Sequence, residues 1–169
     1  MSNFSTIPAG TLFVRETGRR YRQATSAEVI AAARDEVERT FKRDVRISDP
    51  GSVRRYLVHT MAMLTRETFR MILLDAQHQL LDAVDVSVGT IDAASVYPRE
   101  VVKIALRAER CAAVIFAHQH PSGTPEPSTA DRLLTDRLRQ ALALVDVRVL
   151  DHFVIGGSQM TSMAERGLL

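Results

Sequence analysis

Residues 112–138 read AAVIFAHQHPSGTPEPSTADRLLTDRL and contain three segments of different character. The first segment, AAVIFAH, is too short and too apolar for a surface helix, so it predicts a central β-strand. The loop QHPSGTPEP that follows contains three prolines and one glycine, which make it stiff and keep it out of regular structure. A helix is expected to follow from Ser128 to about Leu144.

The sequence on either side of this segment predicts more strands and helices. Four apolar runs are expected to be strands: FRMILLD (69–75), LLDAVDVSVG (80–89), VRVLDHFVIG (147–156) and QMTSM (159–163). The first two runs flank a polar turn and predict a hairpin. Helices are expected from Ser52 to about Leu64 and from Pro98 onward, where a proline is tolerated in the first turn. The whole pattern predicts an α/β fold of helices packed on a sheet.

The first 50 residues predict an extension to this main domain. TLFVRE (11–16) reads as a short strand, the basic run RRYR (19–22) reads as a polar turn, and a helix is expected from Ser26 to about Lys42. The sequence DPGS at residues 49–52 interrupts the preceding structure and can cap a new helix. We therefore expect an N-terminal extension of one strand and one helix at residues 1–50 and a main domain at 51–169.

Length and composition limit the class of protein. A chain of 169 residues with 46% hydrophobic residues can bury one core but is too short for two full-sized domains. With six Phe, three Tyr and no Trp, that core must consist mainly of Ala, Val, Leu and Ile. The formal net charge of +2 is not that of a strongly basic nucleic-acid-binding protein.

The sequence also predicts the cellular environment. Cys111, the only cysteine, cannot form an internal disulfide and is expected to be a buried, unreactive thiol beside an apolar strand. We find neither a secretion signal nor an apolar stretch that approaches the roughly 18 residues of a membrane span. The expectation is a soluble, cytoplasmic protein without a membrane partner.

Two histidines and an aspartate in residues 112–138 have the spacing of metal ligands. Side chains two apart on an extended backbone point to the same side, so His118 and His120 can converge on one ion. Ser128 and Asp131 then lie together in the first turn of the next helix. Two imidazoles and a carboxylate leave a fourth position open for water, as catalytic zinc sites do. Glu67, before a neighbouring predicted strand, is the candidate acceptor for a proton from that water.

Each of these features also has a purely structural interpretation. An HxH pair on its own is more often a pair of hydrogen-bonded loop histidines than a metal site. Ser128 and Asp131 on their own would be a helix N-cap with an acid in the first turn. Glu67 on its own would be a solvated acid. Only the joint pattern favours a metal centre.

The joint pattern can be written E-x(n)-H-x-H-P-x(6)-S-x-x-D, and it is formed by Glu67, His118, His120, Pro121, Ser128 and Asp131. It resembles the motif of the JAB/MPN (JAMM) metalloproteases. The strings GTIDAASVYPREVVKIAL, AHQHPSG, PEPSTADRLLTDRL and VRVLDHFVIGG are similar to the RadC-like branch of that superfamily, from about residue 52 to the C-terminus.

This resemblance implies a fold, a metal and a role for each residue of the motif. The implied fold is a mixed β-sheet flanked by helices, similar to that of cytidine deaminases, and the implied metal is Zn²⁺. His118, His120 and Asp131 would be its ligands, and Glu67 would be the general acid and base. Ser128 would donate its hydroxyl to the developing oxyanion, a charge that a fixed donor stabilises only in the transition state.

Two features depart from the family pattern. Gln119 stands where the branch usually has asparagine, which keeps an amide on a longer side chain. Residues 1–50 show no paired, glycine-containing hairpin of the helix-hairpin-helix type that RadC proteins usually carry for DNA binding. Outside the motif, His152 and Asp151 could support a ligand from behind or be hydrogen-bonded core residues. The run at 19–22 could contact phosphates but is more simply a solvated turn.

Three functions follow as hypotheses. The first is a zinc-dependent metallohydrolase that cleaves a peptide or isopeptide bond of a peptide or protein substrate by means of a Glu-activated, zinc-bound water. The second is a DNA-associated accessory protein, in DNA repair or on mobile elements, because RadC-like chains carry such a label. The third is a metal-bearing but inactive interaction module. The filled motif favours the first.

Overall fold

The computed structural model describes residues 11–18, 20–44, 50–61, 64, 66–89 and 96–169. In chain order its elements are β1 (Phe13–Arg15), β2 (Tyr21–Gln23), α1 (Ser26–Asp44), α2 (Pro50–Met61), β3 (Thr68–Leu74), β4 (Leu80–Val88), α3 (Pro98–Arg107), β5 (Ala113–Gln119), α4 (Thr129–Ala143), β6 (Arg148–Gly156) and β7 (Gln159–Ser162). The chain divides into two compact units, residues 1–36 and 37–169. None of the helices in the described part is both long and apolar enough to cross a membrane.

The N-terminal unit contains a strand that the sequence did not predict. Strands β1 and β2 pair in an antiparallel hairpin in which Val14 lies opposite Arg22. We expected the basic run at 19–22 to be only a polar turn, and this was wrong, because the exposed second strand lacks the alternation of polar and apolar residues that marks a half-buried strand. Arg22 forms ion pairs with Glu16 at 3.0 Å and with Glu28 at 2.5 Å. Its guanidinium is therefore already engaged by two carboxylates.

The larger unit is built on a five-stranded sheet with the order β4-β3-β5-β6-β7. Strands β5 and β6 are parallel, with α4 as the crossover between them, and the other neighbours are antiparallel. The predicted hairpin is confirmed as β3 and β4, and the predicted central strand is confirmed as β5. Helix α2 begins two residues before the expected cap at Ser52. The expected α/β class, a mixed sheet flanked by helices, is confirmed.

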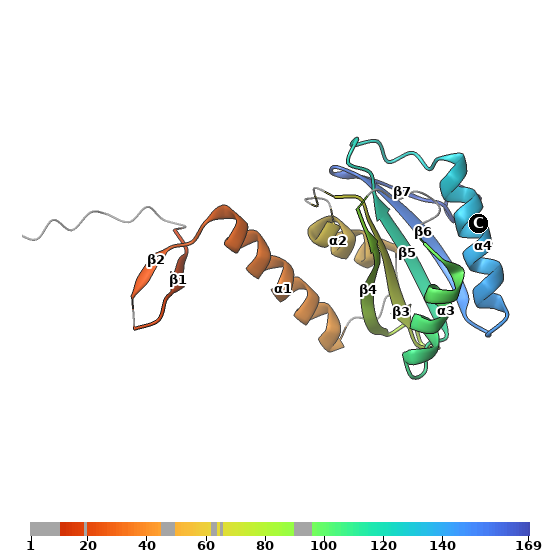
Figure 1. Ribbon diagram of the computed structural model, residues 1–169, viewed down its shortest axis with the longest axis horizontal. Helices are drawn as coiled ribbons and strands as arrows, with labels where there is room; N and C mark the ends of the chain where they lie inside the picture. The colour runs from red at the N-terminus through yellow and green to blue at the C-terminus, as the bar shows by residue number, and fades with distance from the viewer. Residues whose placement is uncertain (1–10, 19, 45–49, 62–63, 65, 90–95) are drawn as a thin grey trace, which may run out of the picture. The chain divides into compact units, whose positions relative to one another are not determined.

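Helices cover both faces of this sheet (Figure 1). On one face, Tyr56, Leu57 and Met61 of α2 pack on alternate residues of β3, β5 and β6. The other face carries α3 and α4, whose core residues include Val101, Ala105, Leu134, Leu138 and Leu142. All seven residues of β5 are buried, because helices cover the strand on both sides.

The alternation of side chains along β5 determines on which face of the sheet His118 lies. Val114 and Phe116 belong to the core under α3 and α4, whereas Ala113, Ile115 and Ala117 belong to the core under α2. By this alternation His118 lies on the α3/α4 face, at the end of β5. Helix α4 begins at the same end of the strand, since a parallel crossover returns the chain along the face of the sheet (Figure 1).

Candidate metal centre

His118 and His120 are brought together by the extended backbone at the end of β5. His118 is paired with Phe69 of β3 and Val154 of β6. Beyond the strand, the His120 amide donates to the Ile155 carbonyl at 2.8 Å, which keeps the chain extended for one more step. The two side chains therefore project to the same side, and their Nε2 atoms lie 2.9 Å apart. The geometry expected from the HxH spacing is present.

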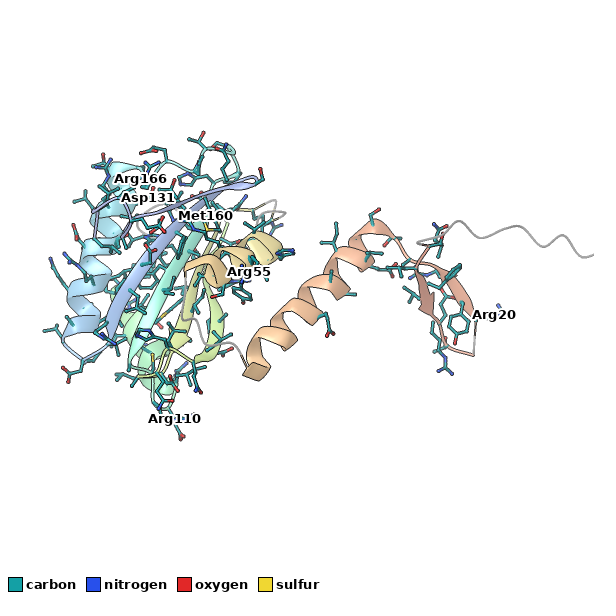
Figure 2. The ribbon with its side chains drawn as sticks, turned by 180° about the vertical axis from the view of Figure 1, so that it is seen from behind. Arg20, Arg55, Arg110, Asp131, Met160 and Arg166 are labelled. Carbon is teal, nitrogen blue, oxygen red and sulfur yellow. The ribbon has the colours of Figure 1, made fainter. Side chains whose placement is uncertain are left out.

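Asp131 reaches the same point from the first turn of α4. Its Oδ1 lies 3.3 Å from His118 Nε2, and its Oδ2 lies 3.7 Å from His120 Nε2. Among the described residues, these three side chains form a cluster whose potential ligand atoms all lie within 4.8 Å of one another. His118 is only 1% exposed, whereas His120 and Asp131 are 17% and 15% exposed. The cluster is therefore buried at His118 and partly open to solvent at His120 and Asp131. Figure 2 labels Asp131, in the first turn of α4.

Ser128 caps α4 and holds the Asp131 carboxylate. The Ser128 hydroxyl accepts from the Asp131 amide at 3.1 Å and donates to Asp131 Oδ2 at 2.5 Å, and the Ser128 amide donates to the same oxygen at 2.7 Å. This is a capping box, with an aspartate at the third helical position. Ser128 and Asp131 thus form a helix cap, and the same Asp131 carboxylate also lies beside the two histidines. A role for Ser128 as oxyanion donor requires its hydroxyl to turn away from Asp131.

His120 is also held from its outer side. Its Nδ1 lies 2.9 Å from the Thr124 carbonyl, within the proline-containing loop. A carbonyl oxygen only accepts hydrogen bonds, so Nδ1 carries the proton and Nε2 is the basic nitrogen. The loop therefore fixes which nitrogen of His120 faces the cluster.

His118 contacts a second buried histidine behind it. His118 Nδ1 lies 2.8 Å from His152 Nε2, and His152 Nδ1 lies 2.6 Å from Thr135 Oγ1. Thr135 Oγ1 is in turn 2.6 Å from the Asp131 carbonyl oxygen. The sequence left His152 either as a support for a ligand or as a hydrogen-bonded core residue, and its contacts fit both descriptions.

Two pKa shifts follow from this arrangement. Burial raises the pKa of Asp131, but the hydrogen bond and charge of His118 and the donors of Ser128 outweigh it and hold that pKa well below 3.8. Complete burial, followed by the charge of His118, lowers the pKa of His152 well below 6.5. Asp131 is therefore an anion and His152 a neutral imidazole across the physiological range.

Glu67 lies just before β3 and is not a member of the cluster. Its carbonyl accepts from the Gly89 amide at 2.9 Å, and the residue is half-buried. Strand β3 pairs with β5 so that Phe69 lies opposite His118. If this register is continued by two residues, Glu67 falls opposite His120 and on the same face of the sheet. The expected catalytic role of Glu67 stays a prediction that this register supports.

Gln119 projects to the opposite face from its two neighbours and joins two parts of the site. Its amide nitrogen donates to the Leu64 carbonyl at 2.8 Å. Leu64 lies only three residues before Glu67. The Gln119 side chain, between the two histidines, is therefore hydrogen-bonded to the chain close to the proposed general base. The Gln119 side chain thus makes a hydrogen bond to the backbone of the segment before β3.

Three residues that support the site were not predicted. Thr135 lies one helical turn after Asp131, and Thr124 contributes only its carbonyl, so neither stands out in the sequence. Gly156 is the third: a Cβ atom there would lie 2.6 Å from the Pro125 nitrogen and closer still to the Gly123 carbonyl oxygen. The helical spacing of four between Asp131 and Thr135 is the only signal that could have found one of them.

Gly156→Ala should therefore weaken metal binding by displacing the backbone of the loop after β5. The new methyl group would push the loop of residues 121–127 away from β6 and with it the Thr124 carbonyl that orients His120. We expect zinc to bind about 10–100-fold more weakly, the range seen when a supporting group of a metal ligand is lost. Calorimetric titration of the metal-free chain with Zn²⁺ measures this change.

Gly157→Ala is the matched control. Gly157 has φ +58°, so alanine is strained there, but apart from Gly157 itself and its two chain neighbours no described heavy atom lies within 4 Å of the position that a Cβ atom would take. This variant should lose stability by about 1 kcal/mol and keep its zinc affinity. Equal zinc affinities for the two variants would refute the role of the loop contact.

Comparison with known proteins confirms the family that the sequence motif resembles. Residues 47–168 match the family described as RadC-like JAB domain. The chain is 52% identical over 128 residues to the UPF0758 protein of Pseudoalteromonas translucida, covering 76% of this chain and 57% of the relative. It is 56% identical over 123 residues to the UPF0758 protein of Nitrosomonas europaea, covering 73% and 54%. The matched part thus spans somewhat more than half the length of each relative, and this chain belongs to the RadC-like JAB domain family.

Proposed function

We propose that this chain is a zinc-dependent metallohydrolase that cleaves a peptide or isopeptide bond. The observation that carries the proposal is the convergence of His118, His120 and Asp131, whose ligand atoms all lie within 4.8 Å of one another. Membership of a JAB domain family supports it. The filled motif supports activity over the alternative of an inactive module.

The chemistry of the three side chains fits a zinc ion. Two imidazole nitrogens and one carboxylate oxygen are a ligand set that catalytic zinc sites use, and they leave one tetrahedral position for water or substrate. The two Nε2 atoms lie 2.9 Å apart next to an anionic carboxylate. Such a group of electron pairs is stable only around a cation, either a proton or a metal ion. A preformed site of this kind should therefore exchange a proton for zinc.

The residues around this position would divide the work of hydrolysis. A zinc ion there would lower the pKa of a water molecule and polarise the carbonyl of the scissile bond. Glu67 would accept a proton from the attacking water and deliver it to the leaving amine. Ser128 would release Asp131 Oδ2 and donate its hydroxyl to the oxygen that becomes negatively charged. The partial burial of the cluster would strengthen each of these interactions.

A metal analysis combined with a substrate panel tests this proposal. The purified chain should contain about one zinc ion, and it should lose stability when a chelator removes the metal, since zinc binds only the folded site. Elemental analysis and thermal unfolding with and without chelator measure both. Zinc-loaded chain should cleave members of a panel of peptides and isopeptide-linked peptides, and chelation should stop it. A chain that binds no zinc, or binds zinc without cleaving any panel member, would contradict the proposal.

The same preparation separates this function from the DNA-associated alternative. DNA binding that survives removal of the metal and weakens steeply with salt would indicate a role carried by phosphate contacts and not by the cluster. Fluorescence anisotropy with labelled duplex DNA, at two salt concentrations, provides that comparison.

A further inference from the structure

A row of buried hydrogen bonds leads from helix α4 to the ring of His118. It begins at Thr135 Oγ1, which lies 2.6 Å from the Asp131 carbonyl oxygen. Because the carbonyl can only accept, the single hydroxyl proton of Thr135 must point to it. The Met163 sulfur, 3.8 Å from the same hydroxyl, is a much weaker acceptor and does not compete.

The direction of the first bond determines the next two. The Thr135 hydroxyl proton is used in the first bond, so Thr135 can only accept from His152 at 2.6 Å, and His152 Nδ1 carries a proton. A second proton on Nε2 would place a charge on a ring that is 0% exposed, so Nε2 carries none. His152 Nε2 is then an acceptor, and its partner at 2.8 Å, His118 Nδ1, must be a donor. His118 Nε2 is therefore the nitrogen whose electron pair remains for the cluster.

We propose that Thr135 and His152 are positioning residues that hold His118 with Nδ1 protonated and Nε2 directed at the metal. This inference rests on the proposed function for the identity of the metal, but the proton positions do not depend on it. The metal ligand Asp131 also supplies, through its backbone carbonyl, the acceptor at which the row begins. His120 receives the same orientation by a separate route, through the Thr124 carbonyl.

Burial makes the row sensitive to the loss of one hydroxyl. His152 is 0% exposed and Thr135 is 1% exposed, so solvent water does not replace a missing partner. Without the hydroxyl, the Nδ1 proton of His152 loses its acceptor, and the ring gains by moving that proton to Nε2. His152 Nε2 and His118 Nδ1 would then both carry a proton and repel each other. The His118 proton is expected to move to Nε2, where it occupies the position of the metal ion.

The matched variants Thr135→Val and Thr135→Ser test this step. Valine keeps the shape of threonine without its hydroxyl, and serine keeps the hydroxyl. In the metal-free, ¹⁵N-labelled chain of 169 residues at mildly alkaline pH, long-range ¹H–¹⁵N spectra should show wild-type His118 and His152 protonated on Nδ1, with scalar coupling between His118 Nδ1 and His152 Nε2. Thr135→Val should instead show both rings protonated on Nε2, with the hydrogen bond between them reversed, and should bind Zn²⁺ about 10–100-fold more weakly. Thr135→Ser should keep the wild-type proton positions and zinc affinity.

Two results would overturn the inference. One is a wild-type His152 protonated on Nε2. The other is a Thr135→Val chain whose proton positions and zinc affinity equal those of wild type. If the wild-type chain shows the stated proton positions but binds no zinc, the proposed function fails while the hydrogen-bond row stands. The wild-type spectrum decides the proton positions even if Thr135→Val does not fold.

Discussion

Glu67→Gln should leave the zinc content of the chain unchanged and lower its peptide turnover by about 10²–10⁴-fold. Glutamine has nearly the same shape as glutamate but cannot accept a proton from water at neutral pH. Zinc should remain because Glu67 is not one of the three clustered side chains that are the proposed ligands. Elemental analysis and cleavage of a panel peptide, measured on the same preparation, separate the two effects.

Glu100→Gln provides the control for this experiment. Glu100 is a surface acid in the first turn of α3, paired with Lys103 at 3.1 Å, and it has no part in the cluster. Its replacement should change neither zinc content nor turnover. Loss of zinc in Glu67→Gln would mean that Glu67 is a ligand, and full turnover would mean that another group moves the proton.

Asp131→Asn is expected to remove zinc while the fold remains. A neutral amide is a poor zinc ligand, and the loss of a direct ligand should weaken binding by more than the roughly 10–100-fold that loss of a supporting residue causes. The amide oxygen can still accept from the Ser128 amide and hydroxyl, so the helix cap should persist. Calorimetric titration with Zn²⁺ and thermal unfolding of the metal-free chain test these two expectations.

The matched control is Asp136→Asn on the same helix. Asp136 is paired with Arg139 at 3.1 Å on the exposed side of α4 and has no contact with the cluster among the described residues. This variant should bind zinc with wild-type affinity. If Asp131→Asn also kept that affinity, Asp131 would be only a capping residue, and the proposed ligand set would be wrong.

One residue thus combines two requirements that the sequence presented as alternatives. Asp131 accepts from the Ser128 cap through Oδ2 and turns Oδ1 toward His118. The cap fixes the carboxylate before any ion binds, which lowers the entropy that binding must overcome. A carboxylate held in this way is a better ligand than a free surface acid.

The sequence by itself determined the features that depend on local backbone geometry. Residues two apart on an extended segment share a side, so His118 and His120 had to project together wherever that strand lay. The spacing from Ser128 to Asp131 had to form one helical turn with a cap. The hairpin and the buried strand β5 followed equally from short-range patterns, whereas β2 did not, because its exposed residues carry no such pattern.

The tertiary structure decided which of these local pieces meet. The parallel pairing of β5 with β6 places His152 opposite Phe116 and so behind His118, a register that no local pattern encodes. The packing of α4 on the sheet brings Asp131 to His118 and Thr135 to His152. The close approach of Gly156 to Gly123 fixes the loop that connects β5 to α4. These contacts join residues far apart in the chain. They depend on the packing of whole elements, which periodicity within one element cannot specify.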